Sequence, residues 1–177
     1  MEVKGIKKLN KAIATNLKPF GIESAELCNE YAYIRGEDRI AYKITEGTTE
    51  DIWFAEFIKE RFNYTVRYPF VMSLLHEVGH HKTDDDISDG IYNFCQKEKA
   101  RIDKSIKRAK TEKTWKKLEW QYFNLPDEIM ATAWAVEYAR THKQEIEKMW
   151  GEMREALIKF YKQNLTLIEE DLENERQ

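Results

Sequence analysis

Three of the four histidines lie within the segment His76-Glu-Val-Gly-His-His81. If this segment is helical, His76 and His80 differ by about 40° in azimuth, so both imidazoles can reach one metal ion. Glu77 lies about 100° round the helix from His76, where its carboxylate can lie beside a metal-bound water without being a ligand. Zinc takes neutral imidazole nitrogens, and a catalytic site keeps one position open for water. We therefore predict His76 and His80 as zinc ligands and Glu77 as the catalytic base. A chance match, or a buried histidine pair without a metal, is the alternative interpretation.

A catalytic zinc site usually has three protein ligands, and Glu128 is the best candidate for the third. It follows Pro126 at the start of a predicted helix, on a face whose other members are all small: Ala131, Thr132, Ala135 and Ala139. Such a face allows a close approach to another helix, and Gly79 offers a matching surface. The alternative is an exposed glutamate that the helix dipole favours at this end.

Four other residues are weaker candidates. Asp86 lies six residues after His80, where a longer zinc motif has its third ligand, but position 83 is Thr instead of the turn-forming Gly. Cys95 lacks a supporting motif and is expected to be a buried structural cysteine. His81 points about 140° from His76 and is expected to pack or hydrogen-bond. His142 is about 21 Å from Glu128 along a straight helix, too far to bind the same ion.

These side chains require a helix over 69–81, with Pro69 in its first turn. Its other side carries apolar residues that would face the core: Val71, Leu74, Leu75 and Val78. Before it, the pattern predicts helices over 4–16 and from a Thr49 cap to Phe62, a β-hairpin over 31–44 around Gly36, and a short strand at 64–67. The fold class is therefore α+β, mostly helical with a small sheet.

The second half of the chain is helical in pattern almost to its end. We predict a basic helical insertion at about 91–123, a break at Asn124-Leu-Pro126, and an amphipathic C-terminal helix at about 143–172. The apolar stripe of that last helix is typical of core. A dimer interface and a cover over the active-site cleft are the alternative interpretations. No repeat or Gly/Ser-rich linker is visible, so we expect one domain over 1–177.

The formal net charge of -3 conceals two blocks of opposite sign. Residues 97–117 contain ten basic and three acidic residues, whereas residues 21–96 contain seven basic and fifteen acidic ones. The two blocks can attract one another in the fold. Because apolar residues interleave the basic stretch at helical spacing, its charge is expected to be a solvated face, and nucleic acid is not the expected partner.

Composition also indicates the compartment. Hydrophobic residues make up 42% and charged residues 34%, as in globular proteins, and two cysteines suit a reducing environment. The N-terminus lacks the apolar region of a signal peptide, and no stretch approaches the roughly 18 apolar residues of a membrane span. We expect a cytoplasmic protein.

The segment HEVGHH at 76–81 resembles the active-site helix of gluzincin-type zinc metallopeptidases. EIMATAWA at 128–135 is similar to the Glu-x-x-Ala-x-x-aromatic-Ala signature of the ImmA/IrrE-type peptidases of phages, mobile elements and bacterial stress regulation. The resemblance implies a zincin-like fold, with His76, His80 and Glu128 as zinc ligands and Glu77 as base. It also implies a protein substrate, for which a helix-turn-helix repressor is a candidate. The family often has Asn where Thr132 stands, and a shorter gap before the third ligand.

The predicted activity is therefore hydrolysis of a peptide bond by a zinc-activated water. The strand at 64–67 can pair with an extended substrate, and Tyr122 or Tyr138 can assist the oxyanion. Three alternatives stay open. The chain can be a binding module that no longer cleaves, residues 97–117 can bind nucleic acid, or that basic stretch can recruit an acidic protein substrate.

Overall fold

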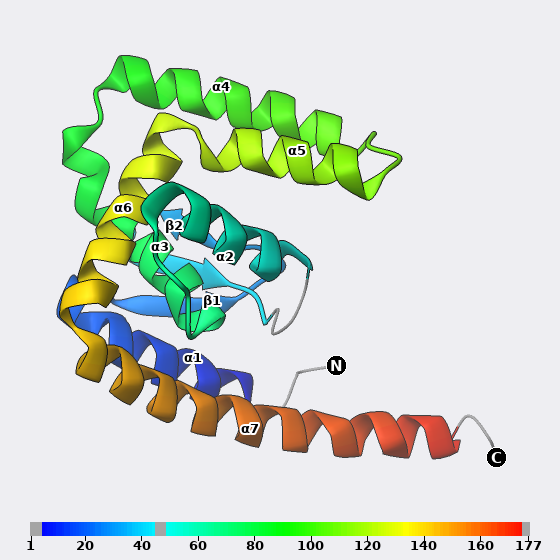
Figure 1. Cartoon of the computed structure of the whole chain (residues 1–177). Helices are drawn as coiled ribbons and strands as arrows, with labels where there is room; N and C mark the ends of the chain where they lie inside the picture. The colour runs from blue at the N-terminus through cyan, green and yellow to red at the C-terminus, as the bar shows by residue number, and fades with distance from the viewer. Residues whose placement is uncertain (1–4, 45–48, 175–177) are drawn as a thin grey trace. The chain divides into compact units, whose positions relative to one another are not determined.

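The computed structural model describes residues 5–44 and 49–174, which form mostly helix and one small sheet (Figure 1). The expected α+β class is confirmed. The chain divides into two compact units, one from 1–43 with 143–177 and the other from 44–142. The expectation of a single domain stays a prediction.

The first unit holds a three-stranded mixed sheet. Its strands are β1 (Ser24–Leu27), β2 (Ala32–Ile34) and β3 (Arg39–Tyr42), in the order β1-β3-β2. β2 and β3 are antiparallel and Gly36 between them has a φ of 79°, so the hairpin predicted over 31–44 is confirmed. β1 was not expected, and it pairs in parallel with β3.

Two helices complete this unit. α1 (Ile6–Leu17), followed by a short 3₁₀ turn η1 (Lys18–Phe20), packs against α7 (Lys143–Asn174) and against β1. Most of the predicted apolar stripe of α7 is buried, as expected of core, although Tyr161 of that stripe is exposed: Ile146, Met149, Met153, Leu157 and Phe160. The Tyr42 hydroxyl donates a hydrogen bond to Asn10 Oδ1 at 2.7 Å, and thus ties β3 to α1.

The second unit is helical throughout its regular structure. It contains α2 (Thr49–Phe62), α3 (Pro69–Thr83), the 3₁₀ turn η2 (Asp84–Asp86), α4 (Asp89–Ile106), α5 (Glu112–Phe123) and α6 (Pro126–Thr141). Pro69 and Pro126 both lie in the first helical turn, where their missing N–H leaves no hydrogen bond unmade. The helix expected over 69–81 is thereby confirmed, and so is the break before Pro126.

The strand predicted at 64–67 is wrong. These residues form an irregular link between the end of α2 and Pro69, and no strand among the described residues pairs with them. The residue before a proline is pushed toward extended backbone, and Tyr68 has φ -129° and ψ 87°. Residues 64–67 have the β-branched and aromatic composition of a strand, but none of the three described strands lies beside them to form hydrogen bonds.

The basic insertion folds as a helical hairpin, in which α4 and α5 lie side by side (Figure 1). The sequence pattern gave no break at 107–111, yet α4 ends at Ile106 and Thr111 caps α5 by accepting a hydrogen bond from the Thr114 N–H at 3.2 Å. The two helices and the α5–α6 link share a small apolar core: Cys95, Ile102 and Leu125, with Ile106, Leu118 and Tyr122 beside it.

Candidate metal centre

The two motif histidines lie on α3, which is buried on every side near its middle. His76 is 7% exposed, and the two imidazoles meet edge to face with centroids 4.7 Å apart. The apolar residues predicted to face the core are fully buried. A helix fixed on all sides holds its histidines in defined rotamers, which a metal site requires.

A close contact between α3 and α6 brings the third candidate to them. A Cβ added at Gly79 would lie 2.9 Å from the Ala131 Cα and 2.8 Å from its carbonyl carbon, closer than real Cβ atoms come. The predicted small face of α6 therefore does meet Gly79. Because the backbones approach so closely, Glu128, one helical turn before Ala131, reaches the imidazoles.

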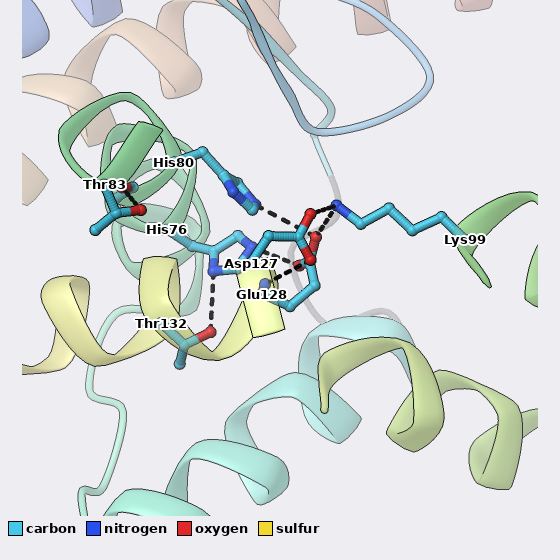
Figure 2. A network of polar contacts seen from close by, with 8 residues as sticks. His76, His80, Thr83, Lys99, Asp127, Glu128 and Thr132 are labelled. Atoms are coloured by element: carbon cyan, nitrogen blue, oxygen red, sulfur yellow. Dashed lines mark hydrogen bonds and ion pairs between the residues drawn. The ribbon is translucent and has the colours of Figure 1, made fainter. Parts of the chain in front are cut away.

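The carboxylate of Glu128 faces the two histidines and contacts one of them through each oxygen (Figure 2). Its Oε2 is 2.9 Å from His76 Nε2, and its Oε1 is 3.3 Å from His80 Nε2. One ligand atom from each residue lies within 4.8 Å of the others, and Glu128 is 3% exposed. Two imidazole nitrogens and a carboxylate oxygen form a donor set typical of a divalent transition metal. This buried group can hold a metal ion.

The surroundings of Glu128 favour its ionised form. Burial raises the pKa of this carboxyl, but the positive charge of His80 and the hydrogen bonds from both histidines outweigh burial and hold the pKa well below its ordinary value. A carboxylate must be deprotonated to bind a metal. A bound cation would replace the histidine protons as the positive charge that keeps this carboxyl ionised.

His76 is oriented by neighbours from two other helices. Thr132 Oγ1 lies 3.0 Å from His76 Nδ1, and the Phe54 ring stands edge-on to the imidazole at 5.2 Å. If Nδ1 carries the proton and donates it to Thr132, the lone pair of Nε2 faces the centre of the site. Thr132 thus contacts one of the three residues that could hold a metal ion.

Two residues that sequence reasoning missed, Lys99 and Asp127, complete the polar network in Figure 2. Lys99 Nζ lies 2.6 Å from Asp127 Oδ2 and 2.5 Å from Glu128 Oε1. Burial lowers the pKa of Lys99, but the attraction of Glu128 and the hydrogen bonds to both carboxylates outweigh it and raise the pKa above its ordinary value. A signal was present in the sequence, because Lys99 lies on the apolar stripe of α4, four residues after Cys95 and three before Ile102.

Glu77 is buried beside the group without being part of it. It is 5% exposed and follows His76 on α3. Burial, followed by the charges of Glu128 and then Glu77, raises the pKa of Tyr122, which places that phenol in the same electrostatic environment. Tyr138 instead stacks between Trp134 and His142 at the end of α6. The roles predicted for Glu77 and for either tyrosine stay predictions.

The remaining candidates lie outside the ligand group formed by the described residues. Asp86 is exposed in η2, and His142 follows the last residue of α6, with its Nδ1 2.8 Å from Thr141 Oγ1. His81 is half-buried and does not join the group. Cys95 is fully buried in the small core, as expected of a structural cysteine, and burial raises the pKa of its thiol.

Comparison with protein-family profiles, with curated proteins and with solved structures found no match to this chain. Within the part of the chain that the structure describes, no helix is both long enough and apolar enough to cross a membrane.

Proposed function

We propose that this protein is a zinc-dependent metallopeptidase of zincin-like architecture that hydrolyses a peptide bond in a protein substrate. The observation that carries the proposal is the convergence of His76, His80 and Glu128, from helices far apart in sequence, with Glu77 next to the first ligand. The resemblance of 76–81 and 128–135 to ImmA/IrrE-type peptidases supports the same activity. It also suggests a regulatory repressor as substrate.

In this mechanism the three ligands hold the ion and Glu77 moves a proton. Bound zinc would supply a Lewis acid that lowers the pKa of a water from 15.7 toward about 7 and polarises the scissile carbonyl. The Glu77 carboxylate accepts a proton from the attacking water as its oxygen bonds to the carbonyl carbon. It then passes the proton to the departing amine nitrogen as the C–N bond breaks.

Metal content and proteolysis measured on the same preparations test the proposal. We expect about one zinc per chain in the wild type and in Glu137→Gln, an exposed glutamate on the same helix, and a loss of zinc in Glu128→Gln. Glu77→Gln should keep the zinc and lose cleavage of casein or of a candidate repressor by at least a hundredfold, because proton transfer is removed while the ligands remain.

Three results would contradict the proposal in different ways. A Glu77→Gln variant that keeps its zinc and cleaves as well as an active wild type rules out the base. A wild type that binds zinc but cleaves neither substrate supports the alternative of a binding module that keeps its metal for structure. A wild type without metal affinity rules out the metal centre itself.

A further inference from the structure

Lys99 is a largely buried cation that lies between the two sequence motifs along the chain and belongs to neither. Its side chain is 15% exposed, and its Nζ lies 5.4 Å from the centre of the Tyr122 ring. A lysine is rarely buried unless its charge is paired, because an unpaired charge in the interior costs several kcal/mol or shifts its protonation. Two carboxylates pair with this one, and both belong to the start of α6.

We propose that Lys99 is a positioning residue of the metal centre, which holds the Glu128 carboxylate in place for an ion bound by His76 and His80. The inference rests on the proposed metal site and adds a third element, α4, to the helices α3 and α6 that carry its ligands. In Figure 2 the lysine approaches Glu128 from the side away from the imidazoles; its Nζ and His80 Nε2 both contact Oε1, whereas His76 Nε2 contacts Oε2.

Asp127 forms the other half of this support. Its Oδ1 accepts the backbone N–H of Glu128 at 2.9 Å, and its Oδ2 accepts Lys99 at 2.6 Å. Both oxygens are therefore used, one to fix the backbone at residue 128 and one to fix the lysine. Ligating carboxylates are commonly held by such outer partners, and loss of a partner typically weakens metal binding about 10- to 100-fold.

Electrostatics points the same way. Asp127 and Glu128 are adjacent and each is 3% exposed, so two negative charges would repel one another in the interior without a shared cation. Lys99 contacts both and offsets this repulsion. The basic insertion is then a structural part of the metal centre. Of the ten basic residues in 97–117, Lys99 is the one that positions Glu128.

Zinc affinity of the full-length protein, measured by competition with a chromogenic chelator, tests the inference. We expect Lys99→Met to bind zinc about 10- to 100-fold more weakly than the wild type. Lys99→Arg should recover most of the affinity, since a guanidinium also donates to two carboxylates. The matched control is Lys97→Met on the same helix, an exposed lysine that should bind zinc as the wild type does.

The visible absorption of bound Co²⁺ separates positioning from a general loss of stability. Lys99→Met should shift the bands or change their intensity, because the carboxylate binds in a different geometry, whereas Lys97→Met should leave the spectrum unchanged. If Lys99→Met does not fold, Asp127→Asn provides the second variant. It keeps the volume but removes the charge that pairs with Lys99, and the same weakening is expected.

Three outcomes would overturn the inference. Unchanged affinity with an unchanged Co²⁺ spectrum in Lys99→Met means that the lysine does not position the ligand. Tighter zinc binding in that variant means that the lysine competes with the ion. A wild type that binds no zinc removes the metal centre first, and this failure differs from the other two because it appears before any Lys99 variant is compared.

Discussion

At the scale of single residues, the network around His76 shows how neighbouring side chains orient one imidazole of the proposed metal site. The imidazole touches Glu128 through one nitrogen and Thr132 through the other, so its ring orientation is fixed at both ends. A second threonine of the same unit, Thr83, is also buried, but it donates to the Gly79 carbonyl oxygen at 2.9 Å and does not contact the ligands. The two threonines therefore differ in function while sharing size and burial.

We predict that Thr132→Val weakens zinc binding about 10- to 100-fold, because the hydrogen bond that orients His76 and sets its tautomer is lost. Thr83→Val removes a hydroxyl of the same size from the same helical unit and should change the zinc affinity less than about twofold. Chelator competition measures both. Equal weakening in the two variants would show that any buried hydroxyl matters and that the contact with His76 has no special role.

At the scale of elements, the contact between α3 and α6 decides whether the ligands meet. Gly79 allows it, although glycine inside a helix costs roughly 1 kcal/mol relative to alanine. Gly151 in α7 offers a comparison, since nothing lies within 4 Å of a Cβ built there. Replacement of glycine by alanine should therefore lower the free energy of unfolding at position 79 and raise it at position 151.

We predict that Gly79→Ala destabilises the protein by about 1–3 kcal/mol, because the Cβ overpacks against the Ala131 backbone. It should also weaken zinc binding by moving Glu128 away from the histidines. Gly151→Ala should stabilise the protein by up to about 1 kcal/mol and leave zinc binding unchanged. Urea unfolding measures the change in stability, and chelator competition measures the change in zinc affinity. A stabilised Gly79→Ala with normal zinc affinity would contradict the close-packing argument.

At the scale of the whole molecule, the metal group lies entirely within the unit of residues 44–142. The unit containing the sheet, α1 and α7 contributes none of the three ligands. The opposite charge blocks meet within the helical unit, where Lys116 Nζ is 2.5 Å from Glu56 Oε2. Because both side chains are partly exposed, such a pair contributes about 0–1 kcal/mol, so we assign metal binding the larger effect on stability.

We predict that zinc at 100 times its Kd stabilises the wild type by about 2.7 kcal/mol, because it binds the folded site. Scanning calorimetry should show this as a higher Tm that falls again when a chelator removes the ion. If the two units unfold separately, the transition of residues 44–142 should be the one that moves. Glu137→Gln should respond like the wild type, and an equal zinc response in Glu128→Gln would contradict the ligand assignment.

The features that depend on local spacing could be predicted from the amino-acid sequence. A helical repeat places His76 and His80 on one face whatever else the chain does, and the small face beside Glu128 indicated its close packing on Gly79. Pro69 and Pro126 indicated where two helices begin, and Gly36 indicated the turn of the β-hairpin. These features could be predicted because covalent geometry and backbone conformation fix them over a few residues.

The tertiary structure alone decided which distant residues meet. Residues 64–67 have the composition of a strand but find no partner, whereas Ser24–Leu27 pairs with β3. In the sequence Lys99 is one of ten basic residues in 97–117, and only the fold of α4 places it against Asp127 and Glu128. Strand pairing and charge burial depend on what lies across the fold, and spacing along the chain does not contain that information.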